Sequence, residues 1–477
     1  MKVGVEQGEP KNAGADLLAI GLADGGELPA PVGAAAGADA AKAGFKKLSL
    51  LRPDGFPPTL VVGLGDRDEL DAEKLRVAAA LAAKEAKRLD SASLAWALPD
   101  SGDDAAAAAA LVTGTILAAY RFDRFKSETD EEAARLESLT IVGAAEPAGA
   151  VETARIVAEA QNRARDLQNT PANVATPSFL AARAEEVAAG SDSLSVEVLG
   201  RPELEEKGMG GILAVSQGGP EEPKMIVLRY SGGGSAPTLG LIGKGVTFDT
   251  GGISLKPGAG MQEMKMDMSG AAAVLEAVAA IAELELPLDL IAVVPATENM
   301  PSGTAIKPGD VIAQYSGKTV EVNNTDAEGR LILADALAYA AELGAERLVD
   351  IATLTGAVEV ALGSTYAGLV ANDDELAAAV ARAGEATGEL AWRLPLHPEY
   401  KELMQGTVAD LSNLGKKRKA GTIYAGSFLE EFVDGKPWVH LDIAGTAWDV
   451  GREYVGKGPS GFGTRLLVDL ARSLANG

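Results

Sequence analysis

The chain has 477 residues, a length that exceeds one ordinary hydrophobic core and predicts two domains. Hydrophobic residues make up 47% and charged residues 23%, the balance of a globular protein in water. The formal net charge of -25 argues against nucleic acid or an anionic membrane as the main partner. Because there is no cysteine, disulfides, thiolate zinc sites and cysteine nucleophiles are excluded.

The start of the chain, MKVGVEQGEP, lacks the basic and apolar regions of a secretory signal. The alanine-rich run over 105–120 is too weakly hydrophobic to span a bilayer. We therefore expect a cytoplasmic protein without a membrane partner.

The pattern over residues 1–150 predicts an N-terminal α/β domain. Apolar runs at 48–53, 59–65 and 93–99 are typical of buried strands, and 70–89 is typical of a helix between the last two. This alternation predicts a parallel layer, and we find no group of catalytic residues in it. Residues 151–167 form an amphipathic pattern that predicts a helical connector, ended by the prolines of NTPANVATP.

Residues 168–477 alternate again and predict a second α/β domain, with a mixed, largely parallel sheet covered by helices. We expect helices at 270–284 and 331–343. The expected strands lie at 225–230, 238–246, 288–296, 319–323, 347–356 and 438–445. In such sheets the active site lies where the carboxyl ends of strands continue into loops.

Several of these strand ends carry charged residues. Lys244 and Asp249 follow one strand, and Asp267 precedes the next helix. Asp326 and Glu328 follow another strand, and in an extended chain they point to the same side, roughly 6–7 Å apart. Arg330 continues that alternation.

These four carboxylates would repel one another without cations between them, and one arginine cannot neutralise them all. Two divalent ions about 3.5–4 Å apart would balance the charge, with Asp326 as a reasonable bridging ligand. The ordinary alternatives are that Asp249 is a turn residue and that Asp267 and Glu328 cap helices. The spacing alone does not decide between these readings.

The string NNTDAEGRL, at 323–331, resembles the hallmark of the leucine aminopeptidase family, which includes cytosol aminopeptidases and bacterial aminopeptidase A. GKGVTFDTGGISLKP, at 243–257, is similar to the family's other catalytic block. MKMDMSGAAAV, ENMPSGTAIKPGDV, DIATLTGA and HLDIAGTAW resemble further family segments in the same order. The resemblance covers roughly the last 300 residues and is weak in the N-terminal domain, for which it implies a macro-like α/β fold.

The resemblance implies a leucyl-type aminopeptidase that removes N-terminal residues by two-metal hydrolysis. It places the metal ligands at Lys244, Asp249, Asp267, Asp326 and Glu328. It makes Lys256 and Arg330 catalytic, with a bicarbonate held at Arg330. Mostly small or apolar residues line the implied substrate pocket: Met264, Asn324, Thr353, Leu354, Gly356 and Ala444. It also implies peptide substrates with a free N-terminus and a homohexamer.

The metal is expected to be manganese or zinc, with magnesium as a further candidate, because the ligands are rich in oxygen. The only histidines, His397 and His440, lie outside the cluster, and His440 reads as a buried core residue. A two-metal phosphoesterase is the main alternative enzyme. A DNA-binding accessory role is the non-enzymatic alternative; the acidic composition opposes it, although 416–419 is a short basic run.

Overall fold

The computed structural model describes residues 1–127, 135–143, 147–415 and 419–476. Most of the basic run at 416–419 therefore lies outside the described residues. The chain divides into two compact units, one of 1–162 with 451–456 and one of 163–450 with 457–477. The division expected at 150 and 167 stays a prediction. The expected connector belongs to helix α4 (Ala148–Asn169), which has residues in both units.

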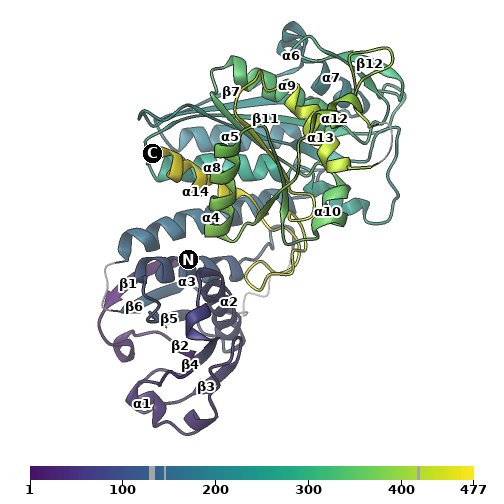
Figure 1. Ribbon diagram of the computed structural model, residues 1–477. Helices are drawn as coiled ribbons and strands as arrows, with labels where there is room; N and C mark the ends of the chain where they lie inside the picture. Colours follow the sequence, from purple (N-terminus) through teal and green to yellow (C-terminus); the bar gives the residue numbers. More distant parts are fainter. Residues whose placement is uncertain (128–134, 144–146, 416–418, 477) are drawn as a thin grey trace. The chain divides into compact units, whose positions relative to one another are not determined.

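The first unit is built on a six-stranded sheet of order β1-β6-β5-β2-β4-β3 (Figure 1). Three of these strands were expected: β3 (Leu48–Leu51), β4 (Thr59–Gly65) and β5 (Ser93–Ala97). The others are β1 (Lys2–Gln7), β2 (Leu17–Ala23) and β6 (Ser138–Gly143). All neighbours pair in parallel except β3 and β4, so the edge strand departs from the expected parallel layer.

Helices α2 (Ala72–Arg88) and α3 (Asp104–Ala118) pack against each other beside this sheet (Figure 1). Each begins at an aspartate whose carboxylate accepts a backbone N–H in the first turn, Asp71 from Lys74 and Asp103 from Ala106. Their inner faces are largely alanine, which lets the two helices approach closely. At Gly114 a Cβ would lie 2.2 Å from the carbonyl oxygen of Arg76, so this contact requires glycine.

The second unit contains a nine-stranded mixed sheet with the order β16-β15-β18-β14-β9-β11-β8-β7, and β10 pairs with β11. The central strands are β9 (Leu239–Gly243), β11 (Asp289–Asn299), β14 (Arg347–Ala352) and β18 (Trp438–Asp442). These central strands pair in parallel, as predicted. The outer strands are β7 (Leu194–Leu199), β8 (Lys224–Ser231), β15 (Ala367–Ala371) and β16 (Ala391–Arg393), and β7, β8 and β15 add the antiparallel pairs.

Helices α8 (Ser269–Glu283) and α9 (Gly329–Glu342) both pack on β9, β11 and β14. The two helices cover opposite faces of the sheet. Residues an odd number apart in a strand point to opposite faces, and in β9 Gly243 faces α8 whereas Gly240 faces Ala345, just after α9. α8 is joined by α5 (Pro177–Ala189) and by α14 (Thr464–Ala475), which also contacts α11 (Asp374–Thr387). α9 is joined by α7 (Gly210–Val215) and α13 (Gly421–Glu430) (Figure 1).

Two expectations need correction. The run at 319–323 is a strand, β13 (Thr319–Val322), but it lies in a separate three-stranded sheet with β12 (Asp310–Ala313) and β17 (Leu411–Ser412). The chain after it does not stay extended, because 325–326 form a turn and Glu328 has helical dihedral angles. In the part of the chain that the structure describes, no helix is long and apolar enough to cross a bilayer.

Candidate metal centre

The predicted strand at 238–246 is interrupted at Lys244. β9 ends at Gly243 and β10 (Gly245–Asp249) begins at Gly245, so Lys244 alone separates the two strands. β10 pairs with β11. The main chain here passes close to α8, since a Cβ at Gly243 would lie 2.5 Å from the carbonyl oxygen of Gly270. The interruption places the side chain of Lys244 in the interior, where the residue is only 2% exposed.

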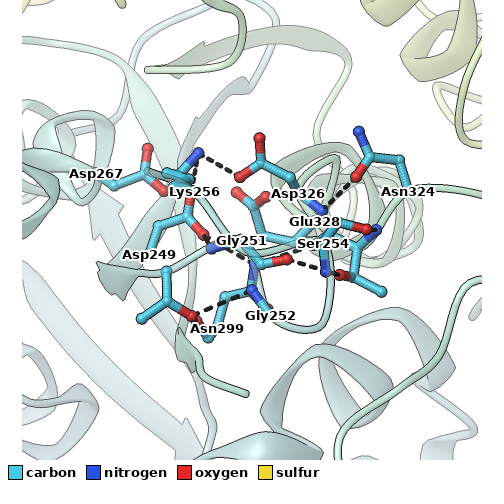
Figure 2. Close-up of polar contacts among 12 residues, drawn as sticks. Asp249, Gly251, Gly252, Ser254, Lys256, Asp267, Asn299, Asn324, Asp326 and Glu328 are labelled. Carbon is cyan, nitrogen blue, oxygen red and sulfur yellow. Dashed lines mark hydrogen bonds and ion pairs between the residues drawn. The ribbon is translucent and has the colours of Figure 1, made fainter. Parts of the chain in front are cut away.

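Glycines after β10 allow a tight loop against the NNTDAEGRL segment. Gly251 and Gly252 have φ angles of 85° and 63°, which side chains other than glycine rarely adopt. Thr325 joins the two loops: its Oγ1 donates to the carbonyl oxygen of Gly251 (2.6 Å) and accepts from the N–H of Ser254 (2.8 Å). Figure 2 shows Gly251, Gly252 and Ser254 of the first loop beneath the acidic side chains.

Lysines and carboxylates alternate in this centre. The Nζ of Lys244 lies 2.7 Å from Asp267 Oδ1 and 2.8 Å from Glu328 Oε1. The Nζ of Lys256 lies 2.8 Å from Asp249 Oδ2 and also pairs with Asp326 (Figure 2). Four carboxylates therefore share two ammonium groups, and a net negative charge remains.

Three of these carboxylates are arranged as metal ligands would be. One oxygen from each of Asp249, Asp326 and Glu328 lies within 4.8 Å of the other two. A cation at the centre of such a group contacts all three. Asp267 adds a buried oxygen, Oδ2, for which the described residues offer no hydrogen-bond partner, while its Oδ1 accepts from Thr353 Oγ1 (2.7 Å).

The ordinary alternatives for these residues are only partly met. Met268 precedes α8 as its N-cap residue and Glu328 precedes α9, and neither side chain caps its helix. Asp249 is a turn residue through one oxygen only: Oδ1 accepts from the N–H of Gly251 and from Asn299 Nδ2, both at 2.8 Å. Its other oxygen faces Lys256. The acidic residues therefore converge, and turns and helix caps do not engage all of their carboxylate oxygens.

Burial and mutual repulsion shift the protonation of the cluster. Burial, together with the charges of Asp249 and Glu328, raises the pKa of Asp267. Burial raises the pKa of Asp326, and burial with the charge of Asp249 raises that of Glu328. Burial would lower the pKa of Lys244, but the charges of Asp267, Glu328 and Asp249 raise it instead. An added cation would relieve the repulsion that drives these carboxyl shifts.

Arg330 lies in the first turn of α9 and, in the described part of the chain, makes no ion pair with the four carboxylates. Its Nη1 donates to the carbonyl oxygen of Asn413 (2.8 Å), and its buried Nε has no partner among the described residues. Burial lowers the pKa of Arg330 to about 10, so the group stays protonated at neutral pH. A buried guanidinium with a free donor is suited to holding a small anion.

The residues expected to line a substrate pocket lie on several loops. Thr353 contacts Asp267, and a Cβ at Gly329, next to Arg330, would lie 3.0 Å from Leu354 Cδ1. Asn324 accepts from the N–H of Asp326 (3.0 Å). Met264 lies in the short helix Met261–Met266 just before Asp267, and Gly356 begins α10 (Gly356–Leu362). Ala444 follows β18 and is held by Asp442 (3.3 Å).

Sequence reasoning missed three buried polar residues that support the centre. Asn299, at the end of β11, donates to Asp249 and to the carbonyl oxygen of Thr325. Asn413 accepts from the N–H groups of Asn323 and Asn324 through its side chain. Asp442 accepts from the loop after β14. A polar residue at the end of an apolar strand was the available signal for Asn299 and Asp442.

A comparison with family models defines the class of this α/β protein. Residues 162–468 match the model of the cytosol aminopeptidase family, catalytic domain, and residues 32–129 match the N-terminal domain of the same family. The chain belongs to the cytosol aminopeptidase family. It is therefore a metal-dependent aminopeptidase, a hydrolase that acts on peptides.

Individual relatives agree with this assignment. The chain is 45% identical to a probable cytosol aminopeptidase of Roseiflexus castenholzii over 99% of both chains. It is 47% identical to one from Geobacter, covering 87% of this chain and 85% of that one. Among solved structures it is similar to the bottromycin maturation enzyme BotP in complex with Mn, with 36% identity and a TM-score of 0.88, covering 97% of this chain and 100% of that one. It is also similar to a mutant of tomato leucine aminopeptidase, with 34% identity and a TM-score of 0.89, covering 99% of this chain and 96% of that one.

Proposed function

We propose that the enzyme is a leucyl-type aminopeptidase whose centre holds two divalent ions. The proposed ligands are Lys244, Asp249, Asp267, Asp326 and Glu328. The observation that carries this proposal is the convergence of Asp249, Asp326 and Glu328, whose oxygens lie within 4.8 Å of one another. The unpartnered Oδ2 of Asp267 supports a second ion on the side of Lys244.

The donor set fits such ions. Four carboxylates against two ammonium groups leave a net charge of -2, before the more distant Arg330 is counted; with Lys244 neutral and Lys256 turned aside the charge is -4, which two divalent ions balance. The lysines now occupy the spaces between carboxylates, so both must move or lose a proton when metal binds. The side chain of Lys244 is only 3% exposed and cannot turn into solvent, so it would bind as the neutral amine. The side chain of Lys256 is 24% exposed and can turn aside.

When bound, a pair of divalent ions acts as a Lewis acid towards the scissile carbonyl and lowers the pKa of the attacking water. The ammonium group of Lys256 then donates to the oxygen on which negative charge develops. Burial would lower the pKa of Lys256, but in the metal-free centre the charges of Asp249 and Glu328 raise it.

Arg330 is proposed to hold a bicarbonate through its unpartnered Nε and to keep that anion beside the centre as a base. The substrate presents its free amino group to the acidic side of the centre, which accounts for action at the N-terminus. Its first side chain lies against Met264, Asn324, Thr353, Leu354, Gly356 and Ala444. These residues are mostly small or apolar, which fits a leucine-like group.

Manganese is the metal we propose first, since the ligands are mainly oxygens, and zinc and magnesium follow. We also propose that the chain forms a homohexamer and acts in the cytoplasm. Exposed apolar residues such as Val360 (91% exposed), Val408 (77%) and Leu255 (60%) supply surface that an assembly would cover.

The direct test compares two substrates on manganese-loaded enzyme. Leucine p-nitroanilide should be cleaved and p-nitrophenyl phosphate should not. The reverse result would favour a two-metal phosphoesterase, and cleavage of neither would refute the proposal. Salt-dependent retardation of duplex DNA in a gel would add the accessory role that the net charge of -25 opposes.

A further inference from the structure

Two loops that carry three of the six proposed pocket residues are tied together by the buried carboxylate of Asp442. The first loop follows β14 and carries Thr353 and Leu354, and the second follows β18 and carries Ala444. The two strands are neighbours in parallel, with Ala352 opposite Asp442. Both loops therefore leave the sheet at the same edge and side by side.

Asp442 contacts both loops through several hydrogen bonds. Its Oδ1 accepts from the backbone N–H groups of Leu354 (3.1 Å), Thr355 (3.3 Å) and Ala444 (3.3 Å). Its Oδ2 accepts from Thr355 Oγ1 (2.6 Å). Asp442 is 0% exposed, so removal of the carboxylate leaves these donors without their partner away from bulk solvent.

A second buried pair lies behind Asp442 on the same two strands. His440 and Asp442 are two residues apart on β18 and point to the same face of the sheet. His440 Nδ1 lies 2.6 Å from Asp350 Oδ1, and Asp350 Oδ2 accepts from Trp438 Nε1 (2.7 Å). Among the residues that the structure describes, none of these side chains hydrogen-bonds to the acidic cluster, so they support the two strands beneath the loops and are not part of the centre.

From this geometry we infer that Asp442 is a positioning residue, which holds Leu354 and Ala444 at the spacing that recognises the first side chain of the substrate. The inference deepens the proposed function and rests on it. It assigns Asp442 no contact with substrate or metal. The consequence is that loss of Asp442 relaxes side-chain selectivity while the acidic centre keeps its composition.

The kinetic test uses Asp442→Ala and Asp442→Asn with leucine and glycine p-nitroanilides. Asp442→Ala should raise KM for the leucine substrate and reduce the leucine-over-glycine preference by about tenfold or more, with wild-type metal content. Asp442→Asn should restore most of the preference. Its remaining oxygen can accept from the three N–H groups, and the Thr355 hydroxyl can turn to Thr422 Oγ1, 2.8 Å away.

Asp335→Ala is the matched control, because Asp335 is also a fully buried aspartate that accepts backbone N–H groups, from Ile212 (3.0 Å) and Tyr315 (2.8 Å). It should lower stability and leave the leucine-over-glycine ratio unchanged. If Asp442→Ala fails to fold, Thr355→Val, which removes only the hydroxyl donor, should shift the preference in the same direction. An unchanged ratio in the Asp442 or Thr355 variants, or a ratio not rescued by Asn, overturns the inference.

Amide hydrogen exchange separates this inference from the proposed function. Exchange at 353–357 and 443–446 should quicken in Asp442→Ala and in neither Asp442→Asn nor Asp335→Ala. If the wild-type enzyme did not cleave N-terminal leucine, the proposed function would fail while this measurement still tested the tie between the loops. Unchanged exchange in Asp442→Ala would overturn the tie itself.

Discussion

Lys244 and Lys256 carry the same charge in one acidic centre but differ in their freedom to move. The side chain of Lys244 is 3% exposed and is fixed between Asp267 and Glu328. The side chain of Lys256 is 24% exposed and reaches Asp249 and Asp326 from a glycine-bounded loop. This difference explains why one lysine suits the role of a metal ligand and the other that of a donor to the reacting oxygen.

Replacement of Lys256 tests this division of roles. Lys256→Ala should retain metal, because four carboxylates remain, and should lower kcat for leucine p-nitroanilide about 10²–10³-fold. The measurement pairs elemental analysis with steady-state kinetics. Lys307→Ala, at an exposed lysine that pairs with Asp310, is the control and should behave like wild type. An unchanged kcat in Lys256→Ala would show that this lysine stabilises no developing charge.

Arg330 provides a second test at the level of single residues. Because its Nε is buried without a described partner, added bicarbonate should activate the wild-type enzyme. Arg330→Ala should lose that activation and lower kcat, while its metal content stays at the wild-type level. Equal activation by bicarbonate in both proteins would contradict an anion site at Arg330.

At the scale of elements, α9 carries Arg330 at its start and a buried carboxylate, Asp335, further along. Burial raises the pKa of Asp335 to about 7, although backbone N–H groups of Tyr315, Ile212 and Gly211 oppose the shift. The folded protein therefore binds this proton more tightly than the unfolded chain. Stability falls as pH rises from about 4 to about 7, by up to about 1.4 kcal/mol for each pH unit.

Asp335→Asn removes this titration. The variant should lose less stability than wild type between about pH 5 and about pH 7, measured as the shift in the urea midpoint of the catalytic unit. Asp192→Asn, at an exposed aspartate in the same unit, should leave the wild-type dependence unchanged. Identical pH dependence in wild type and Asp335→Asn would show that Asp335 is ionised throughout this range.

The central elements were predictable from sequence because they are long, apolar runs: α2, α8, α9, β4, β11, β14 and β18 all fall where the patterns place them. The interruption at Lys244 was not predictable, because it depends on the close approach of α8 to Gly243. The turn at 325–326 was missed for a similar reason, since Ser254, in a distant part of the chain, holds Thr325 through two hydrogen bonds. β1 alternates exposed and half-buried residues and gave little apolar signal.

The sequence predicted that acidic residues converge, whereas the roles of these residues stay predictions. The acidic residues were found from their positions at strand ends, and the resemblance to the family supplied their proposed roles. The premise that Asp326 and Glu328 alternate along an extended chain was wrong, yet the turn brings them together with Asp249. Asn299, Asn413 and Asp442 were missed because their role is to hold loops, which a single sequence does not reveal.

At the scale of the whole molecule, the proposed hexamer would bury apolar surface on the catalytic unit. Val360 lies on the exposed face of α10, directly after the loop of Thr353 and Leu354. Light scattering of the purified protein should give about six times the chain mass of 48.7 kDa. Val360→Glu should weaken assembly if this face lies in an interface. A monomer in the wild type would contradict the hexamer.

The proposed activity depends most on two divalent ions held by the four carboxylates. The most direct measurement is elemental analysis of manganese-loaded, desalted protein, compared between wild type and Asp326→Ala and paired with release of leucine from a leucyl peptide. We predict two ions per wild-type chain with cleavage, and loss of at least one ion together with activity in Asp326→Ala. A wild-type chain that cleaves the peptide with one ion or none, or a variant that keeps both, would contradict it.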